Sequence, residues 1–240
     1  MREFEEALDS VFERCGLSSL LDEKKSEQLC RLFLRLISEN EKYNLTAVTD
    51  LDGVILRHFA DSAACARYLP EGASLLDVGC GAGFPSLPLA ILRPDLRITA
   101  LDATAKRVKY VTDTAALLSL ANVVGVTARA EEYAKPPARE SFDCVTARAV
   151  ANLRALSELC LPFVRVGGLF LSMKATGAAA ELADARRAIG ALGGRVEKTE
   201  DFSLSDGREQ LSRTAILIRK AKPTDAAYPR AWAKILKKPL

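Results

Sequence analysis

A glycine-rich loop is the segment whose residue types point most clearly to chemistry. It reads DVGCGAGFP over residues 77–85 and follows a short apolar run. Glycine allows positive φ angles and a close approach to a ligand, and a helix that begins after such a loop points free N–H groups at it. The spacing is GxGxG, whereas dinucleotide sites have GxGxxG. We expect Gly79, Gly81 and Gly83 to bind a cofactor, with an ordinary strand-to-helix turn as the alternative.

Two acidic residues follow the next two predicted strands. Asp102 ends the run RITALD, where a carboxylate can accept hydrogen bonds from both hydroxyls of a ribose and disfavours a 2′-phosphate. Capping of a helix that begins at Thr104 is the alternative role. Glu131 lies in TARAEEY, where a polar residue would lie beside an adenine ring; a surface charge is the alternative. The two positions together predict a nucleoside site.

These features resemble the class I methyltransferases that use S-adenosylmethionine. The resemblance implies that the glycine loop packs against the methionine part of this cofactor, that Asp102 holds the ribose and that the segment around Glu131 meets the adenine. It also implies S-adenosylhomocysteine as the product. Because S-adenosylmethionine has no phosphate, the loop need not form a phosphate cradle.

The fourth predicted strand and the residues just after it limit which kinds of methyl acceptor are possible. This segment reads FDCVTARAV and lacks the N/D-P-P-Y/F element of enzymes that methylate exocyclic amines. Cys144 and Cys160 lack the Pro-Cys setting of C5 methylation and are interpreted as small core residues. Guanine N7 needs neither device, because its lone pair can attack the methyl group directly once donor and acceptor are held in line. Arg148, just past this strand, is expected to orient the cofactor or the RNA.

The carboxyl-terminal end of the chain is strongly basic. Residues 213–240 carry eight basic side chains and one acidic one, with Tyr228 and Trp232 among them, whereas residues 1–30 carry eight acids and four bases. Basic side chains displace counterions from phosphates, and aromatic rings stack on bases. A solvated tail with Trp232 packed on the domain is the alternative. The candidate RNA-binding residues are Arg57, His58, Lys174, Arg213, Arg230, Lys234, Lys237 and Lys238.

His58 is the only histidine of the chain. Histidine is the usual general base near neutral pH. N7 methylation needs no base, so we interpret His58, which lies beside Arg57 and Asp61, mainly as a hydrogen-bonding partner within the fold.

A longer series of motifs is more specific. In order these are YNLTAVT, RHFADS, LLDVGCGAGFPSLPLAI, LDATAKR, RAEEY, FDCVTARAVANL, LPFVRVGG and YPRAWAKILKKPL. Together they resemble the ribosomal small-subunit methyltransferase G family, also called glucose-inhibited division protein B. The resemblance implies methylation of N7 of one guanine, guanosine 527, in 16S rRNA or a 30S particle. It implies cofactor contacts at Gly79, Phe84, Ala130, Glu131 and Arg148.

The chain departs from the family pattern at a few positions. Cys80 stands where Ser or Thr is more frequent, and Ser86 stands where Gly is usual. In the terminal motif YPRxxGxPxKxPL, Ala233 and Ile235 replace the Gly and the second Pro. The last two changes leave the conformation of the tail open.

The elements that must position these residues follow from the pattern of apolar residues. Leu29, Leu32, Phe33, Leu36 and Ile37 form one face of a helix, and a second helix is expected to begin near Asp50. From residue 74 onward, predicted strands at 74–79, 97–102, 123–128, 142–147, 169–174, 195–200 and 214–220 alternate with helices near 85–93, 104–119, 151–164 and 177–191. No helix separates the last two strands, so that edge is expected to be antiparallel.

This pattern predicts an α/β fold of the Rossmann-like class I methyltransferase type, a mainly parallel seven-stranded sheet with helices on both faces. We divide the chain into a helical extension over 1–70, a cofactor domain over 71–220 and a basic tail over 221–240.

Composition excludes several classes of protein. The 240 residues are 49% hydrophobic and 27% charged, ordinary values for a globular domain. No apolar run approaches the length of a membrane span, and the charged first ten residues do not resemble a signal peptide. With no CxxC pair and one histidine, we expect no metal site and a reduced, cytoplasmic protein. We also expect the protein to act as a monomer. A small-molecule methyltransferase, an NAD-dependent dehydrogenase and a non-catalytic RNA-binding factor remain the rival hypotheses.

Overall fold

A seven-stranded sheet forms the centre of the computed structural model, which describes residues 2–148, 151–175 and 177–240. The strand order is β3-β2-β1-β4-β5-β7-β6. The pairs from β3 to β5 are parallel, whereas β7 is antiparallel to both β5 and β6. The strands are β1 (Ser74–Val78), β2 (Arg97–Asp102), β3 (Val123–Thr127), β4 (Phe142–Ala147), β5 (Val164–Lys174), β6 (Gly194–Ser205) and β7 (Gln210–Lys220). The predicted sheet and its antiparallel edge are confirmed.

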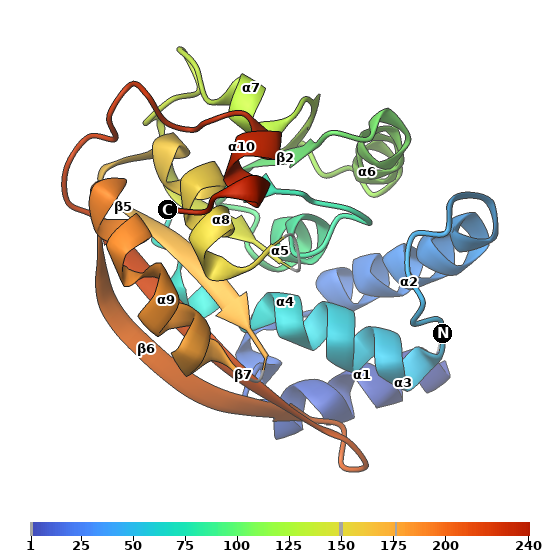
Figure 1. Ribbon diagram of the computed structural model, residues 1–240. Coiled ribbons are helices and arrows are strands. Elements are labelled where there is room, and N and C mark those ends of the chain that lie inside the picture. The colour runs from blue at the N-terminus through green and yellow to red at the C-terminus, as the bar shows by residue number, and fades with distance from the viewer. Residues whose placement is uncertain (1, 149–150, 176) are drawn as a thin grey trace.

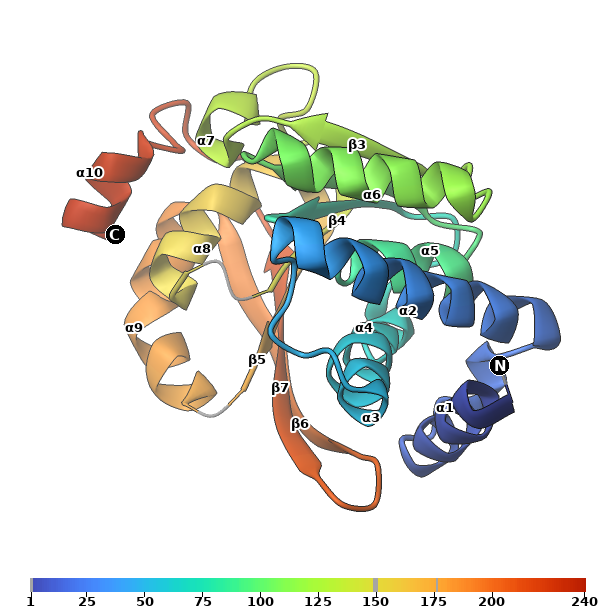
Figure 2. The ribbon, with the colours of Figure 1, turned by 90° about the vertical axis from the view of Figure 1, so that its right-hand side faces the viewer.

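Helices cover both faces of this sheet (Figures 1 and 2). On one face lie α1 (Arg2–Arg14), α2 (Glu23–Tyr43), α3 (Leu51–Val54), α4 (Asp61–Ala63), α5 (Ser86–Leu92) and α6 (Ala105–Leu117). On the other lie α7 (Ala130–Tyr133), α8 (Leu153–Cys160), α9 (Ala178–Ala191) and α10 (Trp232–Lys237). Because both faces are covered, the inner strands are continuous apolar runs rather than alternating ones. Leu75 belongs to the apolar cluster of the first face and its neighbour Leu76 to that of the second.

The first 70 residues pack directly on the sheet domain. The predicted apolar face of α2 is confirmed, with Leu29, Leu32 and Leu36 buried. Asp50 caps α3 by accepting a hydrogen bond from the backbone N–H of Gly53. The helix continues through a π-helical turn at Ile55–Ala60, which brings the RHFADS motif to the edge of the glycine loop. No helix in the described part of the chain has both the length and the apolar character needed to cross a membrane.

Element boundaries differ from the prediction mainly in the second half of the chain. The helix expected near 151–164 ends at Cys160, a 3-10 turn follows at Leu161–Phe163, and β5 already begins at Val164. Pro162 cannot continue the hydrogen bonding of an α-helix, which accounts for the early end. Strand β6 is also longer than predicted, because its alternate residues face solvent and so give only a weak apolar signal.

The last residues form a docked helix rather than a free tail. Ile235 of α10 is fully buried in the cluster that contains α8, so replacing the usual proline there leaves the segment ordered. Arg154 donates hydrogen bonds to the carbonyl oxygens of Leu240 and Pro239. Figure 1 shows α10 beside α8, near the same edge of the sheet as α7.

Candidate active site

The carboxyl edge of the sheet holds a cavity of about 480 Å³, a size suited to a cofactor. In open α/β sheets this edge, where strand order reverses between β1 and β4, is the usual binding position. Six of the eight residues predicted to contact the cofactor line this cavity: Gly79, Gly81, Asp102, Ala130, Glu131 and Arg148. The topology thus brings together residues that lie up to 69 positions apart in the sequence.

Asp102 connects the glycine loop to the start of α6. Its Oδ2 accepts a hydrogen bond of 3.1 Å from the backbone N–H of Gly81, and its Oδ1 accepts one of 2.8 Å from that of Thr104. Thr104, not Asp102, is the N-cap residue of α6. A carboxylate offers about four acceptor positions, so these two bonds leave capacity for ribose hydroxyls.

The donors and acceptors of this cavity fit S-adenosylmethionine. Asp102 offers its carboxylate, and the backbone of Gly79 and Gly81 borders the space without side chains. Ala128, Leu101 and Leu159 supply apolar surface. Glu131 lies in the first turn of the short helix α7, and its carboxylate forms an ion pair with Arg129, with a distance of 2.7 Å from Nε to Oε1. A nucleoside therefore finds acceptors for its hydroxyls and apolar surface for its base.

The other two predicted cofactor contacts lie outside this cavity. A Cβ at Gly83 would lie 2.5 Å from Cδ1 of Leu87, so this position has no room for a side chain between the loop and α5. Gly83 therefore serves helix packing here. Phe84 borders a neighbouring cavity instead, where its ring stacks on that of His58 with 4.4 Å between centroids.

This second cavity has a volume of about 420 Å³ and shares Leu45, Gly79, Gly81 and Arg148 with the first. It is rich in basic side chains: Arg57, Arg148, Lys174 and Arg213 all line it, against the single carboxylate of Asp61. A group bound here would lie next to a cofactor in the first cavity. Its lining favours an anionic acceptor.

Asp61 joins two of these arginines. Its Oδ2 accepts a hydrogen bond of 2.7 Å from Arg148, and its Oδ1 accepts one of 2.6 Å from Arg213. The carboxylate is almost fully buried, so its charge needs these partners. It thereby fixes an arginine from the end of β4 and another from β7 in one place. Asp61 comes from the N-terminal helices, which makes them part of the site.

His58 forms structural contacts, as predicted. Its Nε2 lies 2.8 Å from the hydroxyl of Thr46, which belongs to the YNLTAVT motif. Burial, together with the nearby Arg148 guanidinium, lowers the pKa of the imidazole to about 4. His58 is therefore neutral at pH 7 and joins two motifs that are separate in the sequence.

This shift predicts a loss of stability in acid. The folded-state pKa lies below the unfolded value of about 6.5, so between these values protons bind mainly to the unfolded chain, and stability falls as the pH falls. The buried carboxyl of Asp77, whose pKa is raised to about 7 by burial, has the opposite slope. The comparison therefore needs a His58→Gln variant, which keeps Asp77. From about pH 7.5 to about pH 5, we expect the wild type to lose about 2 kcal/mol more unfolding free energy than the variant, measured by urea titration. Equal losses would contradict the shift.

Most of the predicted RNA-binding cations already have carboxylate partners. Arg57 pairs with Glu209, and Nζ of Lys174 lies 2.8 Å from Oε2 of Glu181. Arg230 forms two side-chain hydrogen bonds and one backbone hydrogen bond with Glu158, which is fully buried. Arg230 thus anchors α10 to α8, and its contact with phosphate stays a prediction. Lys234, Lys237 and Lys238 are exposed and form no ion pair with any residue that the structure describes.

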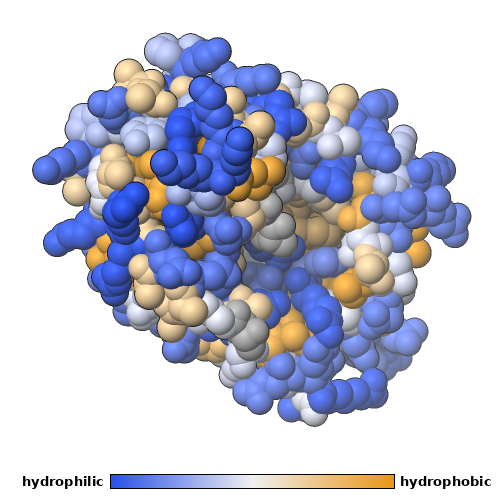
Figure 3. Space-filling model, viewed as in Figure 1, coloured by the Kyte–Doolittle hydropathy of each residue, from blue (hydrophilic) through white to orange (hydrophobic). Residues whose placement is uncertain are grey.

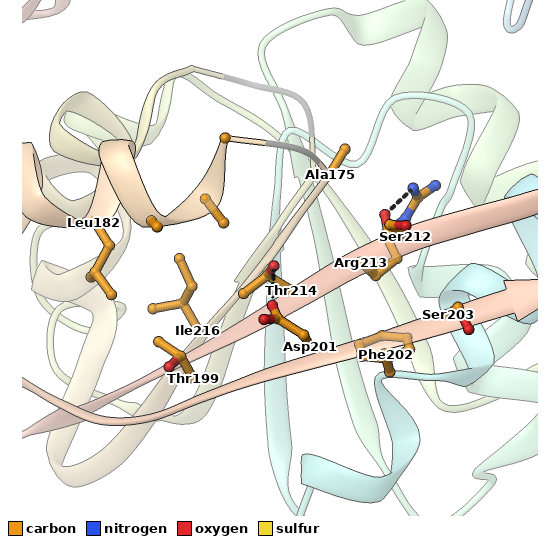
Figure 4. Close-up of a pocket in the computed structure, with 13 residues that line it drawn as sticks. Ala175, Leu182, Thr199, Asp201, Phe202, Ser203, Ser212, Arg213, Thr214 and Ile216 are labelled. Carbon is orange, nitrogen blue, oxygen red and sulfur yellow. Dashed lines mark hydrogen bonds between the residues drawn. The ribbon is translucent and has the colours of Figure 1, made fainter.

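A third cavity of about 660 Å³ continues from the second through Ala175 and Arg213. Figure 4 shows it over strands β6 and β7 and beside α9, with Thr214 donating a hydrogen bond to Asp201 and Arg213 at one end. Hydroxyl groups of Thr199, Ser203 and Ser212 line it. Figure 3 shows that the face viewed in Figure 1 is hollowed near its centre, with hydrophilic side chains around the hollow.

Sequence reasoning missed several of the lining residues. Leu45 from the N-terminal region borders both main cavities, and Trp232 from α10 borders the first. Asp61 was noted only as a neighbour of His58. The motifs YNLTAVT and RHFADS contain two of these residues, but nothing in their spacing shows that they meet the glycine loop.

Comparisons with known proteins agree with this arrangement. The family model described as rRNA small subunit methyltransferase G matches residues 25–211. A ribosomal RNA small subunit methyltransferase G from Geobacillus thermodenitrificans is 44% identical over 234 residues, which cover 96% of this chain and 97% of the relative. The protein of the same name from Leuconostoc citreum is 42% identical over 240 residues and covers 98% of each chain. That from Roseiflexus sp. is 44% identical and covers 92% of this chain and 94% of its own.

Solved structures share the fold at low sequence identity. The YcgJ protein of Bacillus subtilis has a TM-score of 0.51 at 15% identity, covering 70% of this chain and all of its own. Geranyl diphosphate C-methyltransferase of Streptomyces coelicolor, solved with S-adenosyl-L-homocysteine, has a TM-score of 0.52 at 14% identity, covering 68% and 79%. The strand order and these similarities confirm the predicted class I methyltransferase fold.

Proposed function

The chain belongs to the rRNA small subunit methyltransferase G family, and from this premise we propose that it transfers the methyl group of S-adenosylmethionine to N7 of guanosine 527 in 16S rRNA. Methylation of ribosomal RNA of the small subunit is the activity that the family name states. The base, the atom and the position are the finer parts of the proposal. S-adenosylhomocysteine is the expected product.

One observation favours this proposal over a dehydrogenase or a small-molecule methyltransferase. The cofactor cavity and the basic second cavity meet at Gly79, Gly81 and Arg148, so a donor and an anionic acceptor can lie side by side. Arg148 and Arg213 share the single carboxylate of Asp61, so a positive charge remains at the acceptor position, and this charge suits the phosphates of RNA. The third cavity, reached past Arg213, leaves room for nucleotides next to the target.

The mechanism is mainly one of positioning. S-adenosylmethionine supplies an activated methyl group when it is bound. Asp102 holds the ribose, the glycine loop packs against the methionine part, and Arg148, fixed by Asp61, stands between donor and acceptor. N7 of guanine carries a lone pair, so no side chain needs to remove a proton, and the neutral, hydrogen-bonded His58 fits this requirement. Holding two reactants in line can supply several kcal/mol of the rate enhancement.

Mass-spectrometric mapping of methylated nucleotides in 16S rRNA tests the proposal directly. RNA from cells that lack the protein should carry no methyl group at this guanine, and the purified protein with S-adenosylmethionine should restore it. Naked 16S rRNA and 30S subunits should be compared as substrates, since we propose that the protein acts in the cytoplasm, as a monomer, on one or the other. A methyl group on another base, or none, would refute the assignment of the target.

The exposed lysines of α10 and its end should contribute to RNA affinity. Affinity for RNA falls as salt rises, and each lysine near a phosphate contributes about 0.7–0.9 to the steepness of log affinity against log salt. We therefore expect a Lys234→Gln, Lys237→Gln, Lys238→Gln variant to make this slope shallower by about two. Filter binding over a range of salt concentrations measures this. The same change at Lys24, Lys25 and Lys42 on α2 alters net charge equally and should leave the slope close to that of the wild type. Equal slopes for the two variants would show that the three lysines of the C-terminal segment do not contact RNA.

A further inference from the structure

The single tryptophan of the chain lies at the cofactor cavity, although only eight residues follow it in the sequence. Trp232 borders this cavity together with Ala130, Glu131 and Leu159, on the side formed by α7 and α8. Its side chain is partly exposed and packs against the apolar cluster of that face. Among the described residues that line the cavity, it is the one aromatic side chain.

The position of Trp232 is fixed by contacts on both sides of it in the sequence. Before it, Arg230 binds the fully buried carboxylate of Glu158 on α8. After it, Ile235 is fully buried, and Arg154 binds the last two carbonyl oxygens of the chain. Arg139 donates hydrogen bonds to the carbonyl oxygens of Thr224 and Tyr228. A segment held at so many points presents its side chains in one orientation.

We infer that Trp232 is a cofactor-binding residue, which covers the adenine side of S-adenosylmethionine and makes the C-terminal segment part of the cofactor site. An aromatic ring beside a purine binds it by stacking or edge contact, a contribution that the apolar Ala128 and Leu159 cannot replace. Because Lys234, Lys237 and Lys238 follow on the same segment, RNA contacts and cofactor contacts are joined within a few residues. This inference rests on the proposed use of S-adenosylmethionine.

Intrinsic fluorescence gives a direct test, because all tryptophan emission comes from Trp232. We expect S-adenosylhomocysteine to change the intensity or the wavelength of this emission, with a midpoint equal to the Kd from calorimetry. NAD should give no such change. The measurement uses the wild-type protein, so it does not depend on whether a variant folds.

Calorimetry on variants gives the second part of the test. Trp232→Ala should raise the Kd for S-adenosylhomocysteine about tenfold, and Trp232→Phe, which keeps a ring, about two- to threefold. Leu236→Ala on the same helix, whose side chain is exposed, should leave the Kd unchanged. Circular dichroism and the Tm of each variant show whether the fold is retained.

The outcomes separate this inference from the proposed function. If the wild type binds S-adenosylhomocysteine but its emission does not change and Trp232→Ala binds equally well, the role of Trp232 is refuted and the methyltransferase function stands. If calorimetry detects no binding to the folded wild type, both proposals fail. A Kd raised by Trp232→Ala but not by Leu236→Ala, together with the emission change, supports the inference.

Discussion

Replacing Gly79 by Asp is expected to lower the affinity for S-adenosylmethionine at least about a hundredfold. Gly79 has a φ of +76°, a conformation that side chains with a Cβ adopt only with strain. It borders both the cofactor cavity and the second cavity, so we expect an added side chain to reduce the space where donor and acceptor meet. The added carboxylate also lies on the same loop as the N–H that binds Asp102, a carboxylate that must remain available. A hundredfold loss corresponds to about 2.7 kcal/mol.

Isothermal titration calorimetry with S-adenosylhomocysteine measures this effect without any RNA. Gly190→Asp provides the matched control, because Gly190 is exposed near the end of α9 and a Cβ there meets no atom within 4 Å. We expect the control to bind as the wild type does and both variants to show folded circular dichroism spectra. Unchanged affinity in a folded Gly79→Asp protein would show that the cofactor does not bind at this loop.

Replacing Arg230 by Met is expected to cost about 3–5 kcal/mol of unfolding free energy. The reason lies in its partner: Glu158 is fully buried, and Arg230 provides three hydrogen bonds to its carboxylate. Removing one member of a buried ion pair leaves an uncompensated charge in the interior. We expect the C-terminal segment to detach before the remainder unfolds, with a shift of Trp232 emission to longer wavelength.

A double-mutant cycle distinguishes this role from RNA binding. Glu158→Leu in the Arg230→Met background removes the unpaired charge, so it should recover a large part of the lost stability. Lys237→Met on the exposed side of the segment should change stability by less than about 0.5 kcal/mol while lowering RNA affinity. Urea titration supplies the stabilities. If Arg230→Met were as stable as the wild type, the buried pair would not be what holds the segment.

Features that depend on residues close together in the sequence could be predicted from the sequence alone. The apolar run before Gly79, the spacing of three glycines and the acid at the end of the next strand predicted a cofactor loop and its position at a strand end. The alternation of apolar runs with helical stretches likewise predicted the strands, and the absence of a predicted helix between the last two strands predicted the antiparallel edge. These features depend on residues within a few positions of one another, for which backbone preference and burial of one face are decisive.

Contacts between segments that lie far apart in the sequence could not be predicted in this way. Charge alone placed Arg230 with Lys234, Lys237 and Lys238 as one basic tail, because a sequence does not show that Glu158 lies beneath one of the four. The same holds for Asp61, which meets Arg148 and Arg213 from 87 and 152 positions away. Gly83 and Phe84 belong to the glycine loop in sequence, yet Gly83 packs against Leu87 and Phe84 borders the second cavity.

The sequence by itself determined the class of fold and the family, and it predicted the glycine loop as a cofactor site, since these follow from local periodicity, glycine geometry and short motifs. Only the tertiary structure decided which charges are available to a ligand. A charged side chain in the interior must find a partner of opposite sign, and that partner is chosen by proximity in space. This is why Arg230 anchors the C-terminal segment while three lysines beside it remain exposed, and why Trp232 reaches the cofactor cavity.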